Sequence, residues 1–157
     1  MNTDMKRRLF LKASLATGAI GMVMGAGLLT PRAVLASWNS AAFKAETVAD
    51  ALKEGMGSAA TTASGEINLD VPDNPENGAA VPVKISTTLS GVQSIALLVE
   101  KNAKPLCGVF HLGKRMKPMI SIRVKVGESA DIIAVVKAGD KLYSTRKAVK
   151  VTIGGCA

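Results

Sequence analysis

The chain from residue 58 onward consists largely of short runs in which apolar and polar residues alternate, and this two-residue period constrains the fold most. Alternation puts the apolar side chains on one face of an extended chain, as in a β-strand with one buried side. We expect strands at 67–71, 81–89, 93–101, 106–112, 119–126, 132–137 and 141–153, separated by Gly-containing and Pro-containing turns. About seven short strands without intervening helices predict a mostly β fold, an antiparallel β-sandwich of immunoglobulin-like type.

One helix is expected ahead of these strands. Small and apolar residues recur at helical spacing from Ala41 to Met56, and Asn39 or Ser40 can cap the start. Gly55 and Gly57 supply a stop. The sequence therefore predicts one amphipathic helix over about 40–56, packed on a sandwich, and a single domain over 37–153.

The first 36 residues have the features of a leader. The run 6–12, KRRLFLK, is a twin-arginine pattern, an uncharged stretch follows over 13–29, and cleavage is expected after Ala36. Weak hydrophobicity argues against a membrane anchor. We expect a cleaved signal peptide over 1–36 and export of the folded chain to the periplasm. Folded export suits a protein that carries a cofactor or a partner, and the remaining chain has one histidine, two cysteines and no clustered metal ligands. A partner subunit without its own signal is therefore the hypothesis, with no cofactor and no metal.

Positive charge is concentrated in one part of the chain. Residues 37–157 carry 15 Lys and Arg against 11 Asp and Glu, and a single hairpin holds Lys114, Arg115, Lys117, Arg123 and Lys125. Aromatic residues are nearly absent there, although stacking on single-stranded nucleic acid requires them. Nucleic-acid binding is therefore not expected. A solvated basic hairpin is the simplest interpretation, and a docking face for an acidic partner or a guide for small anions is the alternative.

No catalytic arrangement is evident. His111 is the only histidine, and a Cys–His pair needs the two side chains within hydrogen-bond reach, which a tail cysteine does not guarantee. Cys107 lies inside the apolar run 106–110, where a free cysteine acts as a small hydrophobic residue. A Cys107–Cys156 disulfide would tether the tail and is interpreted as an off state or an artefact. The chain is not expected to be an enzyme.

The last four residues, 154–157, form a Gly-Gly-Cys-Ala tail. Gly154 and Gly155 lack a Cβ and restrict the backbone little, so Cys156 is expected on a flexible arm that reaches roughly 10 Å past Ile153. By position alone a frayed terminus is an equal alternative. A thiol placed there can carry a covalent cargo or form an intermolecular disulfide. Two consecutive glycines favour the carrier, since a structural link gains nothing from extra mobility.

Two segments of the chain resemble the SoxY family. The run 75–83, PENGAAVPV, resembles the ENGA-x-VPV segment of that family, and 122–156 resembles its C-terminal half, which closes on Gly-Gly-Cys. The resemblance implies a sulfur-carrier subunit of the periplasmic thiosulfate-oxidising Sox system, with Cys156 as the covalent attachment point and Gly154 and Gly155 as swinging-arm glycines. The family tail usually continues with two more glycines, whereas this chain ends at Ala157.

The resemblance also implies partners. SoxZ, a second immunoglobulin-like protein, would pair with the chain in a heterodimer, and Cys156 disulfides would permit higher oligomers. Transient partners would be the haem protein SoxAX, which joins thiosulfate to the cysteine as an S-thiosulfonate, and SoxB, which releases sulfate and leaves a persulfide. A sulfur dehydrogenase, where present, would oxidise the remaining sulfur.

Overall fold

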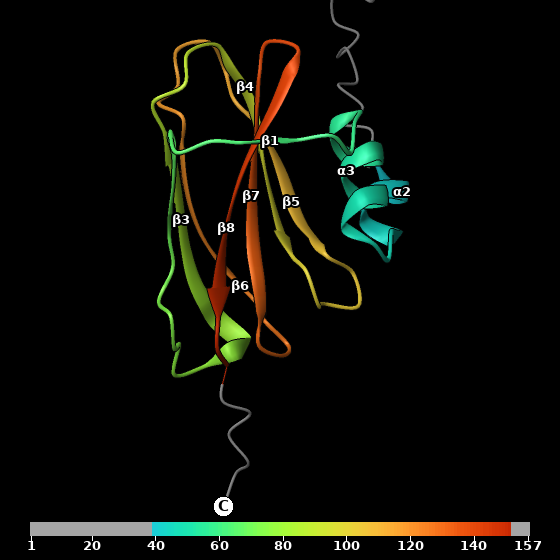
Figure 1. Ribbon diagram of the computed structural model, residues 1–157, viewed down its shortest axis with the longest axis vertical. Coiled ribbons are helices and arrows are strands. Elements are labelled where there is room, and N and C mark those ends of the chain that lie inside the picture. The colour runs from blue at the N-terminus through green and yellow to red at the C-terminus, as the bar shows by residue number, and fades with distance from the viewer. Residues whose placement is uncertain (1–38, 152–157) are drawn as a thin grey trace, which may run out of the picture. The chain divides into compact units, whose positions relative to one another are not determined.

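The computed structural model describes residues 39–151, which form two β-sheets and two short helices (Figure 1). The strands are β1 (Thr62–Ala63), β2 (Ile67–Asp70), β3 (Val81–Thr87), β4 (Val92–Val99), β5 (Leu106–His111), β6 (Met119–Val124), β7 (Ala130–Ala138) and β8 (Lys141–Val149). One sheet has the order β1-β8-β7-β4-β5 and the other β2-β3-β6. The expected mostly β sandwich is confirmed. The leader and the tail lie outside the described residues, so the predictions made for them stay predictions.

The core lies between the two sheets. Inward-facing residues of β3 are fully buried and face those of β4 and β7 across the sandwich, as the alternation in the sequence requires. The largest fully buried side chains of this layer are Val71, Val81, Val83, Ile85, Ile95, Leu97, Val99, Val126, Ile132 and Val136.

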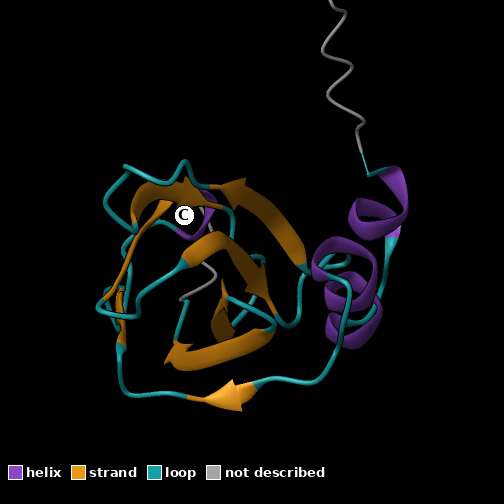
Figure 2. Ribbon diagram, turned by 90° about the horizontal axis from the view of Figure 1, so that it is seen from above, coloured by secondary structure: helices purple, strands orange, loops and turns teal. Residues whose placement is uncertain are grey.

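The central strands β4 and β7 are buried on both faces, because the helices α2 (Ser40–Lys44) and α3 (Val48–Met56) cover the outer side of their sheet (Figure 2). Ala51, Leu52 and Met56 of α3 join the outward-facing residues of these strands in a second apolar cluster. This arrangement explains why the sequence of β4, VQSIALLV, shows little alternation: both of its faces need apolar residues.

The prediction of one continuous helix over 40–56 was wrong, because the structure has two helices separated at 45–47. The expected cap is confirmed: Ala42 N–H donates to Asn39 Oδ1 at 3.2 Å. A second cap starts α3, where Asp50 N–H donates to Thr47 Oγ1 at 3.1 Å. The first helix ends at its C-cap Ala45, whose ψ of 141° leaves the helical region, and the extended Thr47 then starts the second helix.

Two strand predictions also need correction. Strand β1 was missed, and it pairs parallel with β8, so the sandwich is not purely antiparallel. The last strand, expected to reach Ile153, ends at Val149. Ala130, the first residue of β7, pairs with Val149, so β8 has no partner strand beyond this position.

The two ends of the sandwich differ in what they present. The end of β8, the turn 100–105, the loop 125–129 and the 3-10 helix η1 (Gly78–Ala80) lie at one end (Figure 1). Loops 88–91 and 112–118 lie at the other end, which is the upper end in Figure 1. Neither described helix is long and apolar enough to cross a membrane.

Candidate functional site at the root of the C-terminal tail

The predicted site residues Cys156, Gly154 and Gly155 all lie outside the described residues. The described chain ends at Val151, five residues before Cys156, a span of at most roughly 18 Å of extended chain. The structure therefore describes the root of the tail, residues 150 and 151, where the chain leaves the domain.

Val151 is held by a pair of hydrogen bonds to one side chain. Its N–H donates to Ser129 Oγ at 3.0 Å, and the same hydroxyl donates to the Val151 carbonyl at 3.3 Å. Ser129 lies in the loop directly before β7. Its side chain therefore bonds to the Val151 backbone at a position where β7 has no residue left to pair with β8. The chain thus leaves the sandwich at a defined point.

Gly78 packs directly against this root. A Cβ at Gly78 would lie 2.5 Å from Val151 Cγ1 and 2.8 Å from the Val126 carbonyl oxygen, closer than a carbon atom can approach either. The Gly78 carbonyl also accepts the Val126 N–H at 2.7 Å. Only glycine therefore fits this position with the tail root in place. Asn77 sets up the turn, because Ala79 N–H donates to Asn77 Oδ1 at 2.8 Å.

The residue before Val151 is fixed from the opposite side. Lys150 N–H donates to the Asp73 carbonyl at 2.8 Å, and the Asp73 carboxylate forms an ion pair with Lys147 Nζ at 3.0 Å. Lys147 Nζ also donates to the carbonyl of Val71, whose side chain is buried. The loop after β2 is thereby tied to β8 through both its backbone and a charged side chain.

The loop beneath the root is braced by Asn102. Its amide donates to the Lys125 carbonyl at 2.8 Å, and its Oδ1 accepts the Gly127 N–H at 3.1 Å. The brace links the β4–β5 turn to the loop that carries Ser129. Two connections, 71–80 and 125–129, therefore contact the two residues from which the tail departs, and the β4–β5 turn supports the second of them.

The other cysteine is not a reactive group. Cys107 is half-buried in β5, and burial raises the pKa of its thiol to about 11, with a backbone hydrogen bond at Val99 acting in the opposite direction. The thiol therefore stays protonated near neutral pH, where thiolate chemistry is negligible. Its role as an apolar strand residue is in line with the sequence-based interpretation, although it is less buried than expected.

His111, the only histidine, is exposed and lies far from the root of the tail. Strand pairing places it opposite Ser94, level with Leu142 near the start of β8. Seven residues of strand separate Leu142 from Val149, about 23 Å at 3.3 Å per residue. Because five extended residues from Val151 span at most roughly 18 Å, a Cys156–His111 pair is out of reach within one chain.

Sequence reasoning predicted a functional tail, which stays a prediction, and missed the residues that hold its root. Ser129 carried no signal, since it lies in a polar loop like many serines. Gly78 had a signal in the Asn-Gly dipeptide, which marks a turn but not a contact with the chain end. Within residues 39–151, no group of three or more His, Cys, Asp or Glu side chains could hold a metal ion.

The fold and the tail root define a class: an immunoglobulin-like sandwich that clamps the base of a cysteine-bearing C-terminal tail. Residues 52–156 match the family model described as sulfur oxidation protein SoxY. The structure of the sulfur carrier protein SoxY from Chlorobium limicola f thiosulfatophilum is similar, with 36% identity, a TM-score of 0.61, and coverage of 66% of this chain and 94% of that one. The chain belongs to the SoxY family, as its sequence resemblance implied.

A superoxide reductase (neelaredoxin) from Ignicoccus hospitalis matches with 15% identity and a TM-score of 0.49, over 59% of this chain and 81% of that one. No curated protein sequence matches the chain.

Proposed function

We propose that the chain is a covalent sulfur carrier that holds sulfur intermediates on Cys156 and presents them to separate enzymes. The observation that supports this most is the family match, which extends over residues 52–156 and so includes the tail cysteine. The clamp at Val151 suits the role, because a fixed root gives the thiol a limited search volume. With Gly154 and Gly155 as the hinge, the cargo enters another protein's site while the sandwich stays outside.

The proposed cycle begins with oxidative attachment. The Cys156 thiolate and the outer sulfur of thiosulfate join as Cys–S–S–SO₃⁻, and the two electrons released pass to the haem protein SoxAX. Hydrolysis by SoxB then splits the terminal sulfur–sulfur bond: water supplies the oxygen, sulfate and two protons leave, and Cys–S–S⁻ remains. A sulfur dehydrogenase, where present, oxidises the persulfide sulfur. The carrier itself supplies no catalytic group in these steps.

The proposed setting is the periplasm, reached through the twin-arginine pathway without a membrane anchor, with SoxZ as the stable partner. The export signal and the single-domain size support a chain that travels folded with a second subunit. A rival proposal keeps the fold and changes the chemistry: an exported interaction module whose Cys156 forms an intermolecular disulfide. Because the thiol of Cys107 is poorly ionised, Cys156 is the reactive thiol in either case.

Intact-mass measurement separates the two proposals. Protein isolated from thiosulfate-grown cells is measured before and after reductant. The carrier predicts thiosulfonate or persulfide adducts on Cys156 that reductant removes. A Cys156-linked dimer as the only modified form, together with normal thiosulfate oxidation by Cys156→Ser cells, would refute it.

The arm itself is tested by stiffening it. Gly154→Pro with Gly155→Pro is expected to leave thermal unfolding unchanged, because both lie beyond the last strand, and to slow turnover. Ser129→Ala is the comparison variant, because it removes the hydrogen bonds at the root of the tail and leaves both glycines unchanged. Unchanged turnover in the proline variant would show that the glycines do not act as a hinge.

A further inference from the structure

One side of the sandwich ends in two unpaired strands. Strand β5 is last in the five-stranded sheet and β6 is last in the three-stranded sheet. Strand β2 packs against β8 and β7, and Lys147 of β8 donates to the carbonyl of Val71 just after β2. Because β3 and β6 follow β2 in its sheet, β6 lies toward the β4–β5 side of the other sheet. The loop 112–118 connects the two edge strands. We refer to β5, β6 and this loop as the edge surface.

The edge surface leaves apolar groups in contact with water. Met116 and Met119 are the large hydrophobic residues that the described chain exposes, at 60% and 48%, and both belong to it. The inward-facing Ile120 and Ile122 of β6 are only half-buried, whereas their paired neighbours on β3 are at most 1% exposed. Exposed strand edges with apolar neighbours are surfaces to which other chains add.

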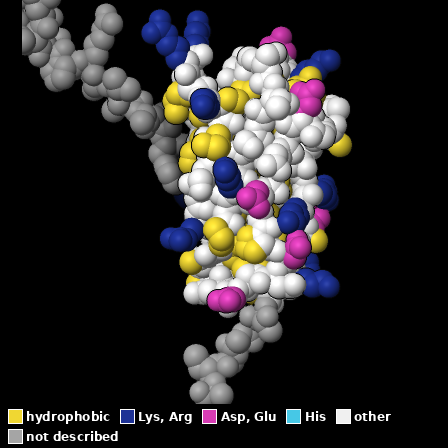
Figure 3. All heavy atoms as spheres, turned by 90° about the vertical axis from the view of Figure 1, so that its left-hand side faces the viewer, with side chains coloured by type: hydrophobic (Ala, Val, Ile, Leu, Met, Phe, Trp, Pro, Cys, Tyr) yellow, Lys and Arg dark blue, Asp and Glu magenta, His cyan; other side chains and the backbone are white. Residues whose placement is uncertain are grey.

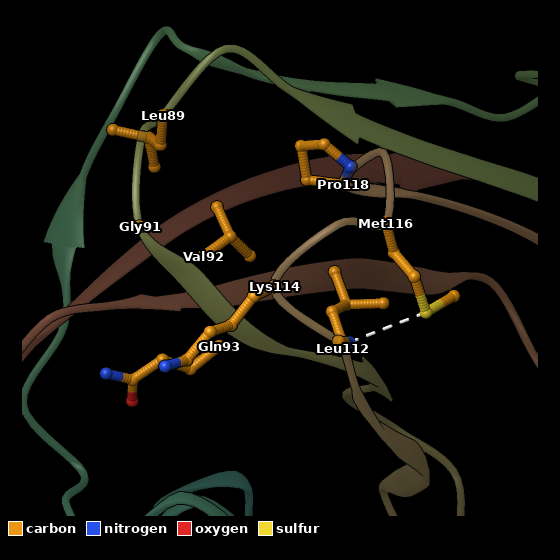
Figure 4. A pocket seen from close by; sticks show the side chains of 9 residues that line it. Leu89, Gly91, Val92, Gln93, Leu112, Lys114, Met116 and Pro118 are labelled. Atoms are coloured by element: carbon orange, nitrogen blue, oxygen red, sulfur yellow. Dashed lines mark hydrogen bonds between the residues drawn. The ribbon is translucent and has the colours of Figure 1, made fainter.

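A pocket opens at the upper end of this surface. Side chains of Leu89, Val92, Leu112 and Pro118 face one another around a volume of about 600 Å³ (Figure 4). Met116 borders it, and its sulfur accepts the Gly113 N–H at 3.4 Å, which holds the loop in place. Methionine adapts its shape to a partner's side chain more readily than branched residues do. The pocket can therefore receive an apolar side chain.

Positive charge surrounds this apolar centre. Residues 106–126 contain five cations and no carboxylate: Lys114, Arg115, Lys117, Arg123 and Lys125. All five are exposed, and none takes part in an ion pair within residues 39–151. The other described residues carry ten Lys and Arg against eleven Asp and Glu. Figure 3 shows Lys and Arg side chains beside hydrophobic atoms at the upper left, with no Asp or Glu side chain among them.

We propose that the edge surface is the docking site of a partner protein whose matching face carries carboxylates around an apolar centre. A second copy of this chain is a poor occupant, because a two-fold contact would bring the five cations of one copy against those of the other. The pocket lies at the end opposite Val151, so a partner seated in it leaves the tail root open. The proposed function supplies the candidate partner for the test, the SoxZ subunit.

Charge reversal in a tail-blocked background tests the site. In Cys156→Ser protein, Arg115→Glu with Lys117→Glu is expected to weaken binding of purified SoxZ by about tenfold or more in titration calorimetry. The control Lys53→Glu with Lys101→Glu makes the same change in net charge on exposed residues elsewhere and is expected to bind within about twofold of the parent.

The apolar centre is tested separately. Met116→Ser with Met119→Ser removes exposed side chains without touching the core, so folding should persist while SoxZ binding falls. Equal binding by all variants, or no binding of SoxZ by the parent, overturns the proposal. So does self-association through this surface in sedimentation, or variant-sensitive binding to phosphatidylglycerol vesicles without binding to SoxZ. Adducts on Cys156 are measured independently, so the carrier function can stand if the docking site fails.

Discussion

Replacing Gly78 with alanine tests how tightly the tail root is built. The new Cβ would lie 2.5 Å from Val151 Cγ1 and 2.8 Å from the Val126 carbonyl oxygen. The valine side chain can rotate, but the carbonyl oxygen moves only with its backbone. That backbone is tied to Gly78 itself, because Val126 N–H donates to the Gly78 carbonyl at 2.7 Å. Relief therefore requires the loop that holds the root to shift.

Overpacking of this kind costs about 1–3 kcal/mol. For a domain of this size, that loss lowers the melting temperature by about 4–12 °C. Gly65→Ala is the matched control, because Gly65 has no positive φ and its added Cβ would meet nothing within 4 Å. Calorimetry of Gly78→Ala and Gly65→Ala measures the two melting temperatures. Melting temperatures that agree within about 2 °C, less than the smallest expected shift, would mean that the Gly78 contact does not hold the root in solution.

Hydrogen exchange at the same site gives a second measure. In Gly78→Ala protein the Val151 amide should exchange faster than in the control, because its hydrogen bond to Ser129 depends on the position of the displaced loop. If the Val151 amide exchanges at an unchanged rate, the destabilisation by Gly78→Ala does not arise at the root of the tail.

Three further perturbations follow from the contacts around the root and in β5. Ser129→Ala removes both hydrogen bonds to Val151 and is expected to cost about 1 kcal/mol while speeding exchange of the Val151 amide, measured by denaturation and hydrogen exchange. Lys147→Met should destabilise the domain more than Asp73→Asn does in urea unfolding. The lysine serves both the ion pair and the backbone carbonyl that follows β2, whereas a half-exposed ion pair alone contributes about 0–1 kcal/mol. Iodoacetamide should label Cys107 in the folded protein about a hundredfold more slowly than after unfolding at pH 8, because its raised pKa keeps the thiol protonated until the pH approaches about 11. Because the pKa is raised, the folded state holds the thiol proton more tightly than the unfolded state. This contribution to the free energy of unfolding is present below pH 9 and is lost as the pH rises toward 11. Alkaline unfolding of Cys107→Ala should not show this loss.

Much of the fold could be predicted because each strand longer than two residues carries its own signal. Seven strands were placed from alternation and turn residues, and all seven occur. Strand β1 escaped because Thr62 and Ala63 are exposed and pair with β8 through backbone alone. No pattern of side chains marks such a strand, and only the position of β8 in the folded sheet creates it.

The predictions for the helix and for the end of the last strand failed for a related reason. Apolar spacing continues across 45–47, so periodicity alone does not reveal the break at Ala45 or the new helix start at Thr47. Alternation likewise continues past Val149, although β7 has no residue left to pair there. In both places local pattern predicts continuity, while hydrogen-bond partners outside that pattern decide where the element ends.

The same distinction separates the two halves of the proposed carrier site. Cys156 and its two glycines are local and could be read directly from the sequence. Their origin is not local: Ser129 and Gly78 lie 22 and 73 residues before Val151, and Asp73 lies 77 residues before Lys150. A tail attached to a frayed strand end would begin its search several residues earlier and sweep a larger volume. Because two connections, 71–80 and 125–129, hold residues 150 and 151, the fold sets the point from which the proposed arm starts, and a carrier that visits several enzymes, as proposed above, needs that point to be the same each time.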